Sequence, residues 1–136
     1  MKYLLDTCCI SDFVKHDINT INHFKQTPPT EIAISSISVM ELEYGLLHNP
    51  DRAKKIKPLI QAFTSSVVIL PHTEEDANFS ATIRTLMRKS GTPIGDYDIL
   101  IAGTALYHGL ILVTSNTKEF RRIPKLMIQN WREILN

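Results

Sequence analysis

Residues 92–109 read Thr92-Pro-Ile-Gly-Asp-Tyr-Asp-Ile-Leu-Ile-Ala-Gly-Thr-Ala-Leu-Tyr-His-Gly109 and predict a strongly apolar helix that opens with two carboxylates. An acid at a helix start can simply cap the free N–H groups there. On a helical wheel, Asp98 lines up with a face of small and apolar residues suited to packing on a sheet, and Asp96 points nearly the opposite way. We therefore expect Asp96 to cap the helix and Asp98 to face the interior.

Short apolar segments along the rest of the chain predict strands, and helical patterns separate them. The strand segments are Lys2–Leu5, Glu31–Ser35, Val67–Leu70, Leu110–Thr114 and Leu126–Gln129. The helical segments are Thr7–Val14, Asp17–Gln26, Ser36–His48, Arg52–Phe63 and Thr73 to about Lys89, with a loop or short helix over Ser115–Arg122. No hairpin signal such as Asn-Gly joins neighbouring strands, so we expect an α/β fold with right-handed crossovers and a mainly parallel sheet.

Three helical segments carry features that predict how they pack. Residues 36–48 have apolar side chains on two sides, which predicts a helix sandwiched between other elements. One stripe is Ile37, Met40, Tyr44 and Leu47, and the other is Val39, Leu42 and Leu46. In the helix that begins near Thr73, the residues expected to point inward are Phe79, Ile83, Leu86 and Met87. Pro58 is expected to kink or split its helix, because proline lacks the N–H of the helical bond.

The composition limits the classes of protein to consider. The 136 residues fit a single domain over 1–136. A formal charge of +1, from 15 basic and 14 acidic side chains, indicates no general affinity for polyanions, so contacts with nucleic acid must come from local patches. No apolar run is long enough to span a membrane and no signal peptide is apparent, which predicts a soluble, cytoplasmic protein without membrane contact.

The two cysteines, Cys8 and Cys9, are adjacent in the sequence. This spacing excludes an ordinary disulfide framework and makes a poor zinc site. We expect both to be small, buried packing residues rather than reactive thiols.

Acidic residues are expected to meet at one edge of the predicted sheet. Asp6 follows the first strand, Asn116 and Glu119 follow the fourth, and Glu41 and Asp98 lie near the starts of two helices. In parallel sheets, ligands bind at the carboxyl ends of the strands. Carboxylates gathered there would raise one another's pKa unless a cation neutralised them, and Mg²⁺ or Mn²⁺ suits oxygen ligands. The pattern predicts metal-dependent hydrolysis of a phosphodiester, in which a metal-bound water attacks phosphorus.

Other catalytic arrangements fit less well. The sequence has no Gly-x-Ser-x-Gly elbow, no Gly-rich phosphate loop and no Gly-x-Gly-x-x-Gly after the first strand. The five histidines show no metal-ligand spacing. A phosphoaspartyl enzyme usually has a second Asp two residues after the first, where this chain has Cys8. Asp6 and Asp98 could each merely cap a helix, but their joint occurrence with Glu41 at one sheet edge favours a site.

Four segments, in this order, cover essentially the whole chain and carry a family resemblance. They are Leu4-Leu5-Asp6-Thr7, Ile34-Ser35-Ser36-Ile37-Ser38-Val39-Met40-Glu41-Leu42 with Tyr44-Gly45, Gly95-x-x-Asp98-x-x-Ile101-Ala102, and Leu112-Val113-Thr114-Ser115-Asn116-Thr117-Lys118-Glu119-Phe120. With them the chain resembles PIN-domain proteins of the VapC type, the toxins of bacterial toxin-antitoxin pairs. The resemblance implies a three-layer α/β/α sandwich, ribonuclease activity with Mg²⁺ or Mn²⁺, homodimerisation, and inhibition by a cognate VapB-like antitoxin.

The resemblance also assigns roles to single residues. Asp6, Glu41 and Asp98 would form the metal-binding core. Asn116 stands where many members of the family have a fourth Asp, and Glu119 would supply a nearby acid instead. This departure bears on the second metal position rather than on activity, because removing one negative charge weakens the attraction for a second cation.

Hydroxyl and guanidinium groups near these acids are candidates for contacts with substrate. By the same resemblance, Thr7 and Ser115 would contact metal-bound water or phosphate through their hydroxyls. Arg121 is a candidate for binding RNA phosphates, within a basic rim that consists of Arg84, Arg88, Lys89, Arg121 and Arg122.

Two rival functions remain open from the sequence. The first is a non-catalytic RNA-binding or protein-interaction module of the same fold, degraded at Asn116. The second is a nuclease acting on DNA, or a phosphohydrolase acting on small phosphates.

Overall fold

The computed structural model describes residues 1–135. Its centre is a sheet of five parallel strands in the order β3-β2-β1-β4-β5. The strands are β1 (Tyr3–Leu5), β2 (Ile32–Ser35), β3 (Val68–Leu70), β4 (Ile111–Val113) and β5 (Ile128–Gln129). The predicted parallel sheet is confirmed, and each strand is one or two residues shorter than its sequence pattern.

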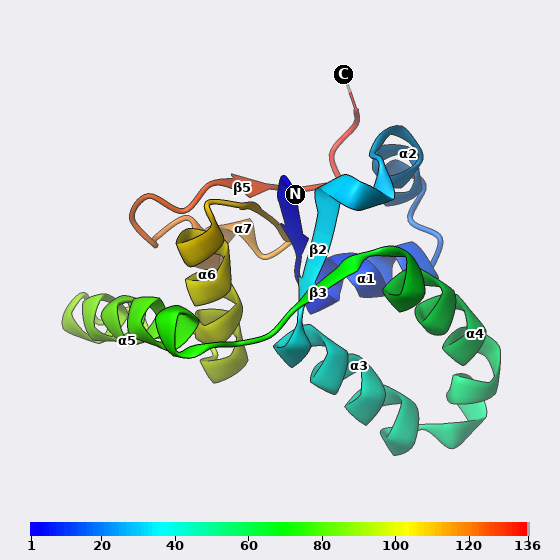
Figure 1. Cartoon of the computed structure of the whole chain (residues 1–136), viewed down its shortest axis with the longest axis horizontal. Helices are drawn as coiled ribbons and strands as arrows, with labels where there is room; N and C mark the ends of the chain where they lie inside the picture. The colour runs from blue at the N-terminus through cyan, green and yellow to red at the C-terminus, as the bar shows by residue number, and fades with distance from the viewer. Residues whose placement is uncertain (136) are drawn as a thin grey trace.

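Helices cover both faces of this sheet. They are α1 (Thr7–Val14), α2 (Ile18–Gln26), a 3₁₀ turn at Pro29–Glu31, α3 (Ser36–His48), α4 (Pro50–Ser66), α5 (Glu74–Lys89), α6 (Asp96–His108) and α7 (Thr117–Phe120). Figure 1 shows α5 and α6 on one side of the sheet and α1, α3 and α4 on the other. The fold is therefore the α/β/α sandwich that the family resemblance implies. Within residues 1–135, no helix combines the length and apolar character needed to cross a membrane.

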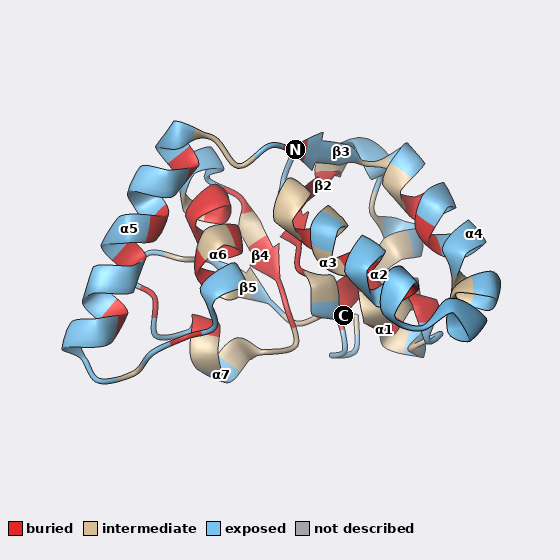
Figure 2. Cartoon of the chain, turned by 90° about the horizontal axis from the view of Figure 1, so that it is seen from below, coloured by how far each residue is buried: buried red, intermediate tan, exposed pale blue. Residues whose placement is uncertain are grey.

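Each face of the sheet has its own hydrophobic core. Leu4 packs with the α5 and α6 side, whereas Leu5 packs with the α1, α3 and α4 side. Neighbouring residues divide in this way because successive side chains of a strand point to opposite faces. Both leucines are completely buried, as expected for a central strand of a parallel sheet. Figure 2 shows the same division, with α6 and β4 largely buried and α4 and α5 exposed on their outer sides.

Side-chain caps fix the starts of several helices. Ser35 ends β2 and accepts a hydrogen bond from the N–H of Ile37 at 3.0 Å, which starts α3. At α5, the Thr73 hydroxyl and the Asp76 carboxylate form the predicted capping box. These caps set where the helices leave the sheet, and α3 consequently starts directly at the carboxyl end of β2.

The prediction that α3 is sandwiched is wrong. Only the stripe with Leu42 and Leu46 is buried, and Met40, Tyr44 and Leu47 are 40%, 55% and 79% exposed. Helix α3 contacts β2, α1, α4 and α6, and Ile37 near its start is half-buried, but the later residues of the Ile37 stripe remain exposed. Apolar residues on two sides of a helix therefore do not by themselves prove burial on both.

The inward face of α5 is narrower than predicted. Ile83 and Met87 are buried, but Phe79 and Leu86 are 41% and 42% exposed. The reason is that α5 lies at the outside of the molecule and packs closely on α6 at Gly103. A Cβ at Gly103 would collide with the Ser80 hydroxyl and lie 2.9 Å from the carbonyl oxygen of Asp76.

Helix α4 is not split at Pro58, because residues 50–66 form one continuous helix. Both Pro58 and Lys54 are exposed, so the Lys54 carbonyl that loses its helical N–H partner remains open to water. A proline therefore interrupts the hydrogen bonding here without ending the helix.

The segment after β5 returns across α1 and α2. Arg132 forms two hydrogen bonds with Asp12, at 2.7 and 2.8 Å, and its carbonyl accepts one from Asn19. Trp131 is only 2% exposed, and the His23 ring stacks on it at a centroid distance of 5.2 Å. These contacts place residues 130–133 beside the start of the chain.

Candidate active site

Three strands bring polar residues to the centre of the sheet's carboxyl edge. Leu5 pairs with Ile34 on one side and with Val113 on the other. The residues that follow, Asp6 and Thr114, are therefore neighbours at this edge, and the Asp6 N–H donates to the carbonyl of Val113 at 3.0 Å. The sheet thus places Asp6 where parallel sheets bind their ligands.

Asp6 is both a helix cap and a buried acid. Its carboxylate accepts a hydrogen bond from the N–H of Cys9 at 2.8 Å and caps α1. Burial raises the pKa of Asp6 to about 6, against the lowering effect of hydrogen bonds from Thr114 and Cys9, and the charge of Asp98 raises it further. Capping does not require this burial beside a second acid, so capping alone does not explain the position of Asp6.

Asp98 interacts electrostatically with the other acids of the site. It is half-buried in the first turn of α6, and it forms no capping hydrogen bond there. Burial raises the pKa of Asp98 to about 6, and the charges of Glu119 and Glu41 add to the effect. Together with its influence on Asp6, this shows that Asp98 is near three other carboxylates.

The prediction that Asp96 caps α6 is wrong. The capping position belongs to Gly95, and Asp96 is an exposed residue of the first turn. A Cβ at Gly95 would lie 3.3 Å from the Oδ2 atom of Asp98. The absence of a side chain at Gly95 therefore lets the Asp98 carboxylate lie back over the helix start.

Glu41 is oriented by Thr7, which lies 34 positions away in the sequence. The Thr7 hydroxyl donates to the Glu41 carboxylate at 2.7 Å and lies 3.2 Å from the hydroxyl of the buried Ser38. This contact gives Thr7 a positioning role that sequence reasoning missed. Its predicted contact with water or phosphate stays a prediction.

Asn116 and Glu119 form the fourth part of the cluster. The Asn116 side-chain N–H donates to the Glu119 carboxylate at 2.9 Å, while the Asn116 backbone N–H donates to the Thr114 hydroxyl. Asn116 therefore holds Glu119 in place, and the charge of Glu119 reaches Asp98. Ser115 is half-buried between Thr114 and Asn116, and its predicted role in substrate binding stays a prediction.

Sequence reasoning did not identify Thr114 as part of this site. It is 1% exposed and joins Asp6 to the loop that carries Asn116. Its position as the first polar residue after the apolar run of the fourth strand is the signal that could have revealed it.

The expected burial of both cysteines holds only for Cys9, which is 3% exposed. Cys8 is exposed because it lies on the outer side of the first turn of α1. Partial enclosure of its sulfur raises the pKa of the Cys8 thiol to about 11, and the charge of Asp6 adds to this. Cys8 is therefore protonated at neutral pH and a poor nucleophile.

The acids supply only oxygen ligands, which suit a hard divalent cation. Within residues 1–135, no group of three or more His, Cys, Asp or Glu side chains is already arranged to hold a metal ion. The cluster is nevertheless chemically suited to one, because the carboxylates raise one another's pKa and a cation would relieve that repulsion.

The predicted basic rim divides between two pockets. Arg84 and Arg88 are exposed on α5 and line a pocket of about 320 Å³ that also includes Asp96, at the start of α6. Arg121 is exposed at the end of α7 and lines a larger pocket of about 630 Å³. Lys89 and Arg122 are also exposed but line neither of these two pockets.

A parallel sheet between two helical layers, with buried acids at its carboxyl edge, defines a class of α/β/α proteins suited to binding a cation there. Comparison with known proteins then identifies the family, since the model of the PIN domain matches residues 3–126. The chain belongs to the PIN-domain family.

Relatives of similar length support this assignment. The chain is 34% identical over 133 residues to the tRNA(fMet)-specific endonuclease VapC of Salmonella typhimurium, with 96% of this chain and 98% of the relative covered. It is 35% identical over 133 residues to the ribonuclease VapC2 of Rickettsia felis, with the same coverage. The crystal structure of VapBC2 from Rickettsia felis bound to a promoter DNA fragment matches with a TM-score of 0.88 and 33% identity, covering 96% of this chain and 99% of that one.

Proposed function

We propose that this chain is a metal-dependent endoribonuclease that hydrolyses RNA phosphodiester bonds, and that it is the toxin of a VapBC-type toxin-antitoxin pair. The likeness to VapC ribonucleases over almost the entire length supports the class of reaction. The observation that carries the proposal is the group of acids at the carboxyl edge of the sheet, where Asp6 is buried beside Asp98 and Asp98 is half-buried near Glu41 and Glu119.

Mg²⁺ is the proposed cofactor, with Mn²⁺ as a substitute, and Asp6, Glu41 and Asp98 would hold it. When bound, the ion supplies an acidified water and offsets charge on the transferring phosphate. The chain's own contribution is to position the ligands. Thr7 orients Glu41, while Thr114 and the start of α1 hold Asp6.

Asn116 and Glu119 are proposed to act at the rim of the metal site. Asn116 lacks the negative charge that would help to hold a second cation, so we expect one firmly bound ion. The Asn116 side-chain N–H holds the Glu119 carboxylate at 2.9 Å, and Glu119 would orient water or substrate near Asp98. Ser115 and Arg121 would contact the phosphates that flank the cleaved bond.

The partners follow from the same proposal. Two structural relatives, from Rickettsia felis and Salmonella typhimurium, are VapBC complexes bound to DNA. We expect a cognate VapB-like antitoxin to bind this chain and block RNA, and we expect a homodimer.

An RNA cleavage assay tests the proposal directly. Wild-type protein should cleave RNA with Mg²⁺, stop when EDTA removes the metal, and recover when Mg²⁺ is added back. Asp98→Asn should abolish cleavage because it removes a metal-binding charge, whereas Asp96→Asn, two residues away on the exposed side, should retain at least half. Cleavage that persists in EDTA, or in the Asp98 variant, would refute the proposed mechanism.

The non-catalytic alternative rests on Asn116, which stands in place of a fourth acid. A binding module of this fold has no need for a cation at the sheet edge. Calorimetry distinguishes the two functions, because a nuclease should bind Mg²⁺ and lose that binding in Asp98→Asn. Parallel assays on single-stranded DNA and on a phosphomonoester test the remaining substrate classes.

A further inference from the structure

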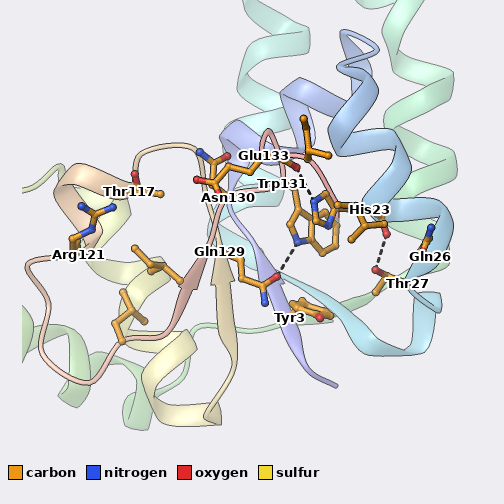
Figure 3. A pocket seen from close by; sticks show the side chains of 14 residues that line it. Tyr3, His23, Gln26, Thr27, Thr117, Arg121, Gln129, Asn130, Trp131 and Glu133 are labelled. Atoms are coloured by element: carbon orange, nitrogen blue, oxygen red, sulfur yellow. Dashed lines mark hydrogen bonds between the residues drawn. The ribbon is translucent and has the colours of Figure 1, made fainter.

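A pocket of about 630 Å³ is lined by none of the clustered acids, and Arg121 is the one residue of the proposed mechanism that lines it. It opens along β5, the edge strand, between α7 on one side and α2 on the other (Figure 3). Its lining includes the aromatic rings of His23 and Trp131, the amides of Gln129 and Asn130, and the guanidinium of Arg121. A volume of this size suits a small ligand with aromatic and polar parts.

The sheet places this pocket close to the proposed site of cleavage. Val113 pairs with Leu5 and with Gln129, so Asp6, Thr114 and Asn130 follow one another along the carboxyl edge. Asn130 is two strand spacings from Asp6, a distance of about 10 Å. Helix α7 separates the two regions, and Glu119 lies on the side of the helix opposite to Thr117 and Arg121 because of the helical period.

Stacking and a polar contact hold the aromatic part of the pocket in place. The His23 ring stacks on Trp131 with an interplanar angle of 4°, and the Nε2 atom of His23 lies 3.1 Å from the carbonyl oxygen of Glu133. Trp131 itself is 2% exposed, so it supports the histidine from below rather than meeting a ligand with its whole face. A ring held in this way provides a stacking surface for a planar ligand.

The two amides in the pocket present hydrogen-bond donors. The Gln129 oxygen accepts from the Trp131 indole at 3.2 Å, and the Asn130 oxygen accepts from the N–H of Arg132 at 3.0 Å. Their NH₂ groups remain to donate to a ligand. Guanine and uracil offer ring carbonyl oxygens to such donors, whereas adenine and cytosine carry an amino group in the corresponding place.

We propose that this pocket binds a nucleobase of the RNA next to the cleaved bond, with preference for a base that carries an exocyclic oxygen opposite the donors. The base stacks on His23, and its phosphate lies toward Arg121, which Figure 3 shows at the opposite end from His23 and Trp131. The polar lining favours a nucleotide over an apolar segment of a protein partner. As an RNA subsite the pocket rests on the proposed ribonuclease function, but binding to it requires neither metal nor catalysis.

Mononucleotide binding tests the proposal without cleavage. Trp131 is the only tryptophan, so its fluorescence reports on the pocket in the full chain. In EDTA, GMP and UMP should change this emission saturably, AMP and CMP should bind about tenfold more weakly, and inorganic phosphate should have no effect. Equal responses to all four nucleotides or to phosphate alone would overturn the proposal. So would a response only to the antitoxin, which would assign the pocket to the protein partner.

Variants locate the ligand within the pocket. Arg121→Gln should weaken GMP about tenfold and leave guanosine unaffected, because only GMP carries the phosphate. Lys118→Gln on the same helix, which is exposed and outside the pocket, should change neither. His23→Ala should weaken both GMP and guanosine about tenfold, with His48→Ala as its control. If His23→Ala fails to fold, Arg121→Gln still decides. A GMP affinity equal to that of the wild-type protein, or an equal loss for GMP and guanosine, would overturn the proposed orientation.

The two proposals can fail separately. Asp98→Asn should lose cleavage and retain GMP binding. If the wild-type protein binds nucleotides but does not cleave RNA, the proposed ribonuclease function is refuted and the proposed nucleotide pocket is retained. Sequencing of the cleavage products shows where each variant cuts. If Arg121→Gln and His23→Ala both cut at the same positions as the wild-type protein, the proposed role of the pocket is refuted and the ribonuclease function is retained.

Discussion

The start of α5 and the carboxyl edge of the sheet both bury an aspartate, but they treat its charge in opposite ways. Burial acts to raise the pKa of Asp76, yet hydrogen bonds from the Thr73 hydroxyl and N–H, at 2.6 and 2.7 Å, outweigh it and lower the pKa. Burial raises the pKa of Asp6 to about 6 because Thr114 and Cys9 compensate it incompletely and Asp98 adds repulsion. Burial of an acid therefore does not by itself mark a functional site, and a buried acid with a raised pKa beside other acids is the better candidate.

The largest expected difference between the two regions is in catalysis. Asp6→Asn should reduce RNA cleavage below detection, because it removes a proposed metal ligand at the centre of the edge. Asp76→Asn should leave the rate per folded molecule nearly unchanged. Cleavage assays on both variants, normalised by circular dichroism, provide the measurement. Equal losses in the two variants would contradict the distinction between a site acid and a structural acid.

The contact between Thr7 and Glu41 should have the next largest effect. Thr7→Val removes the hydroxyl that orients Glu41 and should weaken Mg²⁺ binding about 10- to 100-fold, as is typical for partners of metal ligands. Thr7→Ser keeps a hydroxyl and should restore most of the affinity. Calorimetric titration measures both, and unchanged affinity in Thr7→Val would show that Glu41 needs no positioning.

The raised pKa values predict a dependence on pH. Asp6 and Asp98 hold their protons up to about pH 6 in the folded protein, against 3.8 in the unfolded chain. Lowering the pH from 7 to 5 should therefore weaken Mg²⁺ binding about tenfold for each of the two acids that must lose its proton. Calorimetry in buffers of different ionisation enthalpy counts the protons released. A flat profile over this range would contradict the coupling between the acids.

The shifted pKa values of these aspartates also predict how the free energy of unfolding changes with pH. Because the folded-state pKa values of Asp6 and Asp98 lie above 3.8, their contribution favours folding at low pH and is lost as the pH rises through about 6. The lowered pKa of Asp76 acts in reverse, so its contribution is present above pH 3.8 and is lost as the pH falls. The two regions should thus oppose each other in the pH dependence of unfolding.

The smallest expected effect is the loss of the cap at α5. Asp76→Asn should lower the free energy of unfolding by about 1 kcal/mol, since it weakens the charged half of the capping box. Glu75→Gln, exposed in the same turn, should change it by less than about 0.5 kcal/mol. Urea denaturation at pH 7 gives both values, and a larger loss in Glu75→Gln would contradict the role of the box.

Local patterns were sufficient to predict most of the elements. The strands, the helices Thr7–Val14 and Ser36–His48, and the capping box at Thr73 were all recognisable, because apolar periodicity and cap residues act over a few positions. Two failures share one cause. Exposure of one side of α3 and of Phe79 in α5 depends on which surfaces meet other elements, and local sequence carries no information on that. At Pro58 the predicted split does not occur, and the predicted alternative, a kink, stays a prediction.

The candidate site was predictable as a set of residues but not as a set of contacts. Asp6, Glu41, Asp98 and Glu119 stand out because acids at strand ends and helix starts meet at one edge of a parallel sheet. Asp96 was wrongly given the cap of α6 because Gly95 occupies that position instead. The bond from Thr7 to Glu41 could not be predicted, because it joins residues 34 positions apart.

The sequence alone determined the alternation of strands and helices and the identity of the acids, because short-range periodicity and residue chemistry are enough for both. Only the tertiary structure decided which acids are compensated. It paired Asp12 with Arg132 across 120 positions, brought Asp98 close enough to raise the pKa of Asp6, and formed the pocket beside β5. The physical reason is that electrostatic compensation depends on distances through space, and the packing of the sheet and its two helical layers sets those distances.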